Sequence, residues 1–163
     1  MKKFTHYIIE SEEYSLKDLK NDFKEFNKTL FKSELPQVKL VLSPKKKDGY
    51  SGWLKVRYND KDNLDDYTIK DLMVTSIYKN DSIRGLLIHE MIHLYLTCNG
   101  FHEGINCELH GKEFNAKLRE VQSKTDIKIP LNESDSNILK LKISDAINSE
   151  EPDWMKAILD QYR

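Results

Sequence analysis

Near its start the chain alternates hydrophobic and charged positions at helical spacing. Apolar residues follow one another at intervals of three and four, which predicts an amphipathic helix over residues 16–31. Ser15 directly precedes this stretch, and serine is a favoured N-cap. The apolar positions are Leu16, Leu19, Phe23, Phe26 and Leu30.

Three short apolar segments then predict strands, at residues 38–42, at residues 53–58 and within residues 67–78. Asp48-Gly49 lies between the first two segments and is a hairpin signal, so we expect those two strands to pair directly. The polar residues 59–66 predict a loop before the third strand. The expected order is therefore one helix followed by three strands.

A long apolar segment without proline comes next and predicts a helix from residue 83 to about residue 98. Asn99-Gly100 supplies its stop signal. After a loop, a second helix is predicted from His110 to about Ser123. Residues 139–143 alternate like a strand, although their neighbours also allow a helix, and Pro152 predicts the start of a final short helix.

Composition narrows the class of protein. The 163 residues fit a single domain, 1–163. Lys plus Arg number 26 and Asp plus Glu 27, and this net charge of −1 argues against nucleic-acid binding through overall charge. The compact basic cluster at residues 45–47 is interpreted as a solvated hairpin tip. Two cysteines, Cys98 and Cys107, indicate free thiols rather than a disulfide framework.

The sequence also bears on location. Its apolar runs are all much shorter than the roughly 20 residues of a membrane-spanning helix, so we expect no membrane contact. The first residues lack the apolar core of a secretory signal peptide. We therefore expect a cytoplasmic protein.

The most informative stretch is an H-E-x-x-H motif, His89-Glu90-Met91-Ile92-His93. On a helix the two histidines lie one turn apart on the same face, so both can bind one zinc ion. Glu90 lies beside the metal, where it can take a proton from water. Apolar residues fill most of the remaining circumference, which predicts a buried helix with one polar notch. A cation there would offset the cost of burying an ionised glutamate.

A catalytic zinc needs a third protein ligand and one open position. The extended metzincin motif is excluded, because it needs glycine and histidine where this chain has Leu96 and Asn99. The downstream candidates are His102, Glu103, Cys107, Glu108, His110 and Glu113.

His110 is favoured as the third ligand because we expect it at the start of the next helix. Gly111 follows it, and a residue without a side chain would let that helix approach the metal helix closely. Glu113 is the main alternative, one helical turn further on. His102 is expected to be exposed in the loop, and Cys107 is a minor alternative.

These motifs resemble those of the SprT-like metallopeptidases, which include the bacterial SprT proteins and the DNA-linked protease Spartan. The resemblance rests on the HExxH motif followed by His110-Gly111-Lys112-Glu113-Phe114, and it covers a core of about residues 15–122. It implies one zinc ion per chain, bound by His89, His93 and His110, with Glu90 as the general base. Residues 123–163 are then a C-terminal extension of unassigned structure.

The resemblance also implies a fold and a set of partners. The expected fold is α+β, with a minigluzincin-like core: an N-terminal helix, a small three-stranded sheet, a buried HExxH helix and a following helix that carries the third ligand. Many SprT-like proteins add a zinc ribbon with two C-x-x-C pairs, but no cysteine follows Cys107 in these 163 residues. We therefore expect only weak DNA contact.

The predicted function is that of a zinc-dependent metalloendopeptidase that hydrolyses protein or peptide substrates, with DNA-associated proteins as the implied class. A strand within residues 67–78 is expected to pair with an extended substrate. One alternative is an ImmA-like regulatory metallopeptidase with an acidic third ligand. Another is a non-catalytic zinc-containing binding module, although Glu90 argues against it because a structural site needs no base. Tyr95 is directed away from the notch and is not proposed to stabilise the oxyanion.

Overall fold

The computed structural model describes residues 13–130, which form three helices and a three-stranded sheet. The α+β class and the predicted order of elements are confirmed. The predicted elements at 139–143 and after Pro152 lie outside the described residues. In chain order the elements are α1 (Leu16–Leu30), β1 (Leu40–Ser43), β2 (Gly52–Asp60), β3 (Asn63–Thr75), α2 (Asn80–Cys98) and α3 (Lys112–Gln122).

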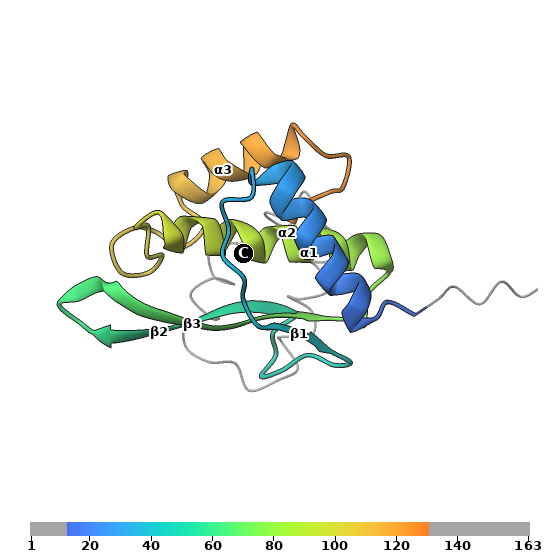
Figure 1. Cartoon of the computed structure of the whole chain (residues 1–163), viewed down its shortest axis with the longest axis horizontal. Coiled ribbons are helices and arrows are strands. Elements are labelled where there is room, and N and C mark those ends of the chain that lie inside the picture. The colour runs from blue at the N-terminus through green and yellow to red at the C-terminus, as the bar shows by residue number, and fades with distance from the viewer. Residues whose placement is uncertain (1–12, 131–163) are drawn as a thin grey trace, which may run out of the picture.

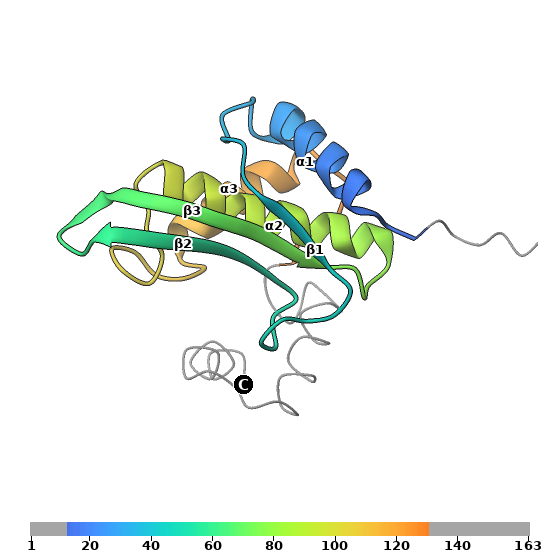
Figure 2. The ribbon, with the colours of Figure 1, turned by 60° about the horizontal axis from the view of Figure 1, so that its bottom comes forward.

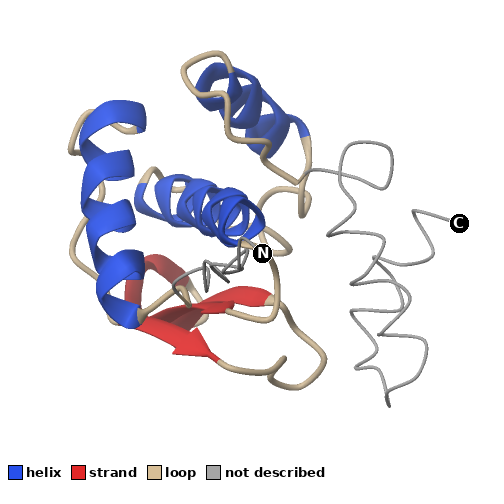
Figure 3. Ribbon diagram, turned by 90° about the vertical axis from the view of Figure 1, so that its right-hand side faces the viewer, coloured by secondary structure: helices blue, strands red, loops and turns tan. Residues whose placement is uncertain are grey.

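Helix α2 forms the centre of the described region. It lies between the sheet on one side and α1 and α3 on the other, as Figures 1 and 3 show from two directions. Because neighbours cover it on both sides, its apolar residues occupy most of its circumference. Ile83, Leu87, Ile88, Met91 and Leu94 are all completely buried. Among the described helices, none has the length and apolar character needed to cross a bilayer.

Helix α1 begins and packs as its sequence predicts. The Ser15 hydroxyl accepts a hydrogen bond from the Asp18 backbone amide at 3.2 Å, and the Ser15 amide donates to the Asp18 carboxylate at 2.8 Å. Such a cap contributes about 1 kcal/mol. Four of the five predicted apolar positions are buried, and only Leu16 is exposed.

The sheet corrects one predicted pairing. A tight turn does form at Asp48-Gly49, and both residues have positive φ angles, 51° and 79°. However, the strand order is β1-β3-β2, with β1 parallel and β2 antiparallel to β3. The expected direct pairing of the first two strands is therefore wrong. The Asp-Gly signal fixes only a local reversal, whereas the fully buried Leu72 and Val74 place β3 in the centre.

The predicted loop over residues 59–66 is also wrong. Strand β2 continues to Asp60 and β3 begins at Asn63, so only two residues form the turn. This end of the hairpin extends past α2 (Figure 2) and its residues are mostly exposed. Polar residues suit strands that face solvent on both sides, so the hydrophobic alternation that identifies a strand is missing here.

Candidate metal centre

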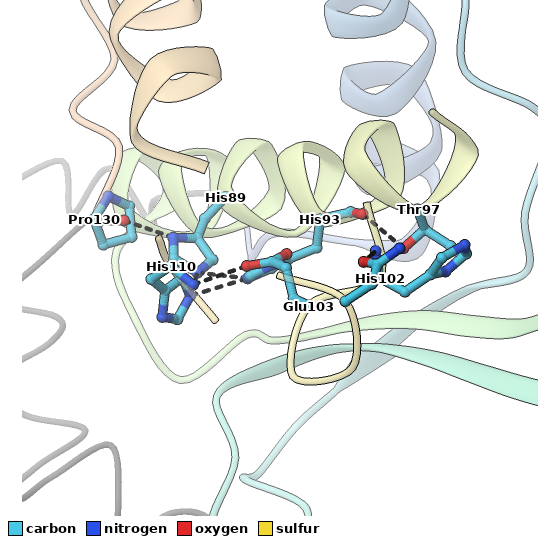
Figure 4. A network of polar contacts seen from close by, with 8 residues as sticks. His89, His93, Thr97, His102, Glu103, His110 and Pro130 are labelled. Carbon is cyan, nitrogen blue, oxygen red and sulfur yellow. Dashed lines mark hydrogen bonds and ion pairs between the residues drawn. The ribbon is translucent and has the colours of Figure 1, made fainter. Parts of the chain in front are cut away.

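Three histidine rings converge beside α2. His89 and His93 lie one turn apart on the helix, and His110 approaches from the loop between α2 and α3 (Figure 4). The Nε2 atoms of each pair are 3.1 Å apart. Within residues 13–130, these three are the one group of potential metal ligands whose donor atoms gather this closely.

The hydrogen-bond partners of the rings fit a bound metal ion. His89 Nδ1 donates to the Pro130 carbonyl oxygen at 2.6 Å, and His93 Nδ1 lies 2.5 Å from the Glu103 Oε1 atom. With these protons on Nδ1, the Nε2 atoms of His89 and His93 present lone pairs to one another, which repel unless a cation or proton lies between them. A tetrahedral zinc with bonds of about 2.0–2.1 Å separates its ligand atoms by about 3.3 Å, close to the spacing seen here.

His110 lies before α3 rather than on it, so the prediction that a helix carries the third candidate ligand is wrong. Its φ angle is 51°, in the left-handed region, and Gly111 is the N-cap of α3. The His110 backbone amide donates to Glu103 Oε2 at 2.8 Å, and the His110 carbonyl accepts from the Asn115 side-chain amide at 3.2 Å. These two bonds hold a backbone conformation that is unfavourable for histidine.

Gly111 has a different role from the one expected. A Cβ added there would lie 2.8 Å from the Glu108 Cβ and 3.0 Å from its carbonyl oxygen. The glycine is therefore needed for the close fold of its own loop. The expectation that it lets α3 approach α2 is wrong.

Glu90 is buried next to His89 on α2, with 3 % of its surface exposed. Its carboxylate lies against Gly52 at the start of β2, where an added Cβ would come within 2.8 Å of Oε1. Glu90 does not belong to the group of three histidines. Because glycine has no side chain, Gly52 leaves room for the Glu90 carboxylate.

Three of the other candidate ligands do not join the histidine group, namely Glu113, Cys107 and Glu108. The Glu113 carboxylate is 4.0 Å from the Lys112 ammonium group, and the Glu108 side chain is exposed. Both Cys98 and Cys107 are free thiols. Burial raises the pKa of each of these thiols above its usual value, which disfavours the thiolate that a metal would bind.

Sequence reasoning missed two contacts that orient the candidate ligands. The sequence marks Glu103 only as a candidate ligand, but its carboxylate contacts both His93 and His110. The contact of the Pro130 carbonyl with His89 has no sequence signature, because every residue carries a backbone oxygen. Both contacts come from residues outside the HExxH motif, one in the loop after α2 and one in the segment after α3.

His102 is buried, with 1 % of its surface exposed, so the expectation that it faces solvent is wrong. Its Nδ1 atom is 2.7 Å from the Tyr58 hydroxyl, and its ring packs edge-on against Tyr58 and Tyr67. The loop therefore folds back onto the hairpin of β2 and β3. Within the described part of the chain, the His102 Nε2 atom has no hydrogen-bond partner.

The segment after α3 also packs against α2. Ile129 is 2 % exposed, and its amide donates to the Gln122 side chain at 3.0 Å. A Cβ added at Gly85 would overlap the Lys128 carbonyl oxygen, so α2 and this segment are in direct backbone contact. This packing places the Pro130 carbonyl beside His89. The extent of the domain, with a core of about 15–122, stays a prediction.

The fold and the site define an α+β domain with a three-histidine candidate metal centre on a buried helix. A family model described as the SprT-like family matches residues 19–134, which is most of the chain. The chain therefore belongs to the SprT-like family, as its motifs indicated, and membership suggests a metallopeptidase-like domain. No curated protein matches the chain significantly.

Proposed function

We propose that this protein is a zinc-dependent metallopeptidase with a minigluzincin-type core and one zinc ion bound by His89, His93 and His110. The observation that carries the proposal is the triangle of Nε2 atoms at 3.1 Å, with the Nδ1 atoms of His89 and His93 bonded to acceptors outside it. Family membership supports zinc as the metal. When bound, zinc supplies a Lewis acid that activates water and polarises the scissile carbonyl, and three protein ligands leave a position open.

Glu90 is proposed as the general base. Its burial and its position beside His89 support this role, because a carboxylate in a dry site next to the ligands is poised to accept a proton. It would take the proton of the attacking water and deliver it to the leaving amine. Gly52 would leave the carboxylate room to do so.

The substrate is proposed to be a protein or peptide that adds as an extended strand to the free edge of β2. The strand expected for this role lies within residues 67–78, but residues 72–74 are paired on both edges, with β1 and with β2. That expectation is therefore wrong for this stretch. Among the described strands β2 has one neighbour, and it begins at Gly52 beside Glu90. DNA-associated proteins remain the proposed substrate class.

Metal analysis and one substitution test this function. We expect about one zinc per purified chain. Glu90→Gln should retain the zinc and lose about 10²–10⁴-fold in the rate of peptide hydrolysis, since it removes only the base. Glu108→Gln is the matched control, because it makes the same change on an exposed side chain of the neighbouring loop. Wild-type hydrolysis by verified Glu90→Gln protein would refute Glu90 as the general base. A zinc-loaded wild-type protein that hydrolyses no peptide would instead favour a zinc-binding module.

A further inference from the structure

One carboxylate contacts two of the three proposed zinc ligands. Glu103 Oε1 lies 2.5 Å from His93 Nδ1, and Glu103 Oε2 accepts the His110 backbone amide at 2.8 Å. The Glu103 side chain is 8 % exposed, so water competes little for either oxygen. Figure 4 shows Glu103 beside the converging rings.

The two contacts constrain different degrees of freedom. At His93, the carboxylate holds the proton on Nδ1 and orients the ring, so that Nε2 presents its lone pair to the metal position. At His110, it holds the backbone, whose left-handed φ angle of 51° is unfavourable for a non-glycine residue. One side chain thus aligns a ligand on α2 with a ligand from the following loop.

The backbone around Glu103 is itself held in place. The adjacent His102 bonds to the Tyr58 hydroxyl on β2, and its amide donates to the Asn106 side chain at 2.7 Å. Glu103 also forms an isolated bridge with Cys107. The carboxylate is therefore presented from a fixed loop, as preorganisation of the ligands requires.

We propose that Glu103 is a positioning residue that preorganises His93 and His110 and thereby sets the zinc affinity of the site. This inference rests on the proposed zinc site but does not depend on peptidase activity. Glutamine at this position would keep the shape of the side chain. It offers one acceptor oxygen in place of two, so it can serve only one of the two donors.

The test compares zinc affinity by chelator competition in the wild-type protein, Glu103→Gln and Glu108→Gln. Loss of a partner of this kind lowers metal affinity by about 10–100-fold, which is the decrease expected for Glu103→Gln. Glu108→Gln makes the same change in charge in the same loop, and its affinity should remain at the wild-type value. Glu103→Asp retains two acceptors on a shorter side chain and should lie between the wild type and Glu103→Gln.

A spectroscopic readout separates positioning from a general effect on folding. In the zinc-loaded protein, the His93 Nδ1 proton should give a downfield imidazole resonance that moves upfield in Glu103→Gln and not in Glu108→Gln. Equal zinc affinities for the wild type and Glu103→Gln would overturn the inference alone. A metal-free Glu103→Gln protein that fails to fold would also overturn it, in favour of a structural role. A wild-type protein that binds no zinc would overturn the proposed function as well.

Discussion

Gly52→Ala would displace the proposed base without altering it chemically. The new Cβ would lie 2.8 Å from Glu90 Oε1, 3.2 Å from Glu90 Cγ and 3.1 Å from the Met73 carbonyl oxygen. Relaxed contacts between carbon atoms are about 3.5–4.0 Å, so a shift of several tenths of an ångström is needed. Met73 is held in the central strand opposite Trp53, and the carboxylate of Glu90 is therefore the group that moves.

The size of the effect follows from this displacement. A misplacement of about 1 Å can cost on the order of 10²-fold in rate, so a smaller shift should lower kcat by about tenfold. Zinc affinity should be unchanged, because none of the close contacts involves a proposed ligand. Overpacking costs about 1–3 kcal/mol, partly offset by about 0.4–1 kcal/mol from the reduced entropy of the unfolded chain.

Peptidase kinetics, zinc titration and thermal unfolding on the same samples test this prediction. Gly100→Ala is the matched control, because Gly100 has a φ angle of 84° and open space around it. That variant should lose a similar amount of stability through backbone strain while retaining kcat. A Gly52→Ala protein with the kcat of the wild type would refute the idea that the position of the Glu90 carboxylate controls hydrolysis.

Three further outcomes are expected. In chelator competition, His110→Ala should weaken zinc binding far more than Glu113→Ala, because His110 belongs to the histidine group and Glu113 does not. The reverse order would favour an acidic third ligand. Gly85→Ala should displace residues 128–130, because the new Cβ would overlap the Lys128 carbonyl oxygen, and it should therefore lower both the Tm and the zinc affinity. An unchanged zinc affinity in a zinc titration would contradict the role of the Pro130 carbonyl. In anisotropy titrations, the protein should bind DNA with a Kd no lower than about micromolar, and the affinity should fall further when the lysines at 45–47 become alanine. Nanomolar binding that survives this change would reveal another DNA-binding surface.

The parts of this fold that follow from sequence are those fixed by local periodicity. Ser15 and the apolar positions after it determine α1, since capping and amphipathic spacing operate within a few residues. The same holds for α2, where an apolar segment interrupted by His89, Glu90 and His93 predicts a buried helix with a polar notch. Family membership could be inferred as well, because its motifs are short and contiguous.

The parts that could not be predicted depend on long-range partners. Asp48-Gly49 specifies a turn but not which strand lies beside β1, and that choice depends on burying the apolar end of β3. The burial of His102 likewise depends on Tyr58 and Tyr67, more than thirty residues earlier in the chain. The position of His110 ahead of α3 depends on a left-handed backbone conformation that no residue-type preference indicates.

The candidate site has its groups on one helix and the loop after it, but their environment comes from the whole described region. His89 depends on the segment after α3, His93 on the loop before α3, and Glu90 on the space at the start of β2. An isolated α2 would carry the HExxH motif without the partners that orient it, so we expect high zinc affinity only in the folded domain. Zinc binding selective for the folded state would then stabilise that state by about 2.7 kcal/mol at a free zinc concentration of 100 Kd. Substitutions at Gly85 or Glu103, which touch no metal, should therefore alter metal affinity and thermal stability together, whereas a change confined to the Glu90 carboxylate should alter catalysis alone.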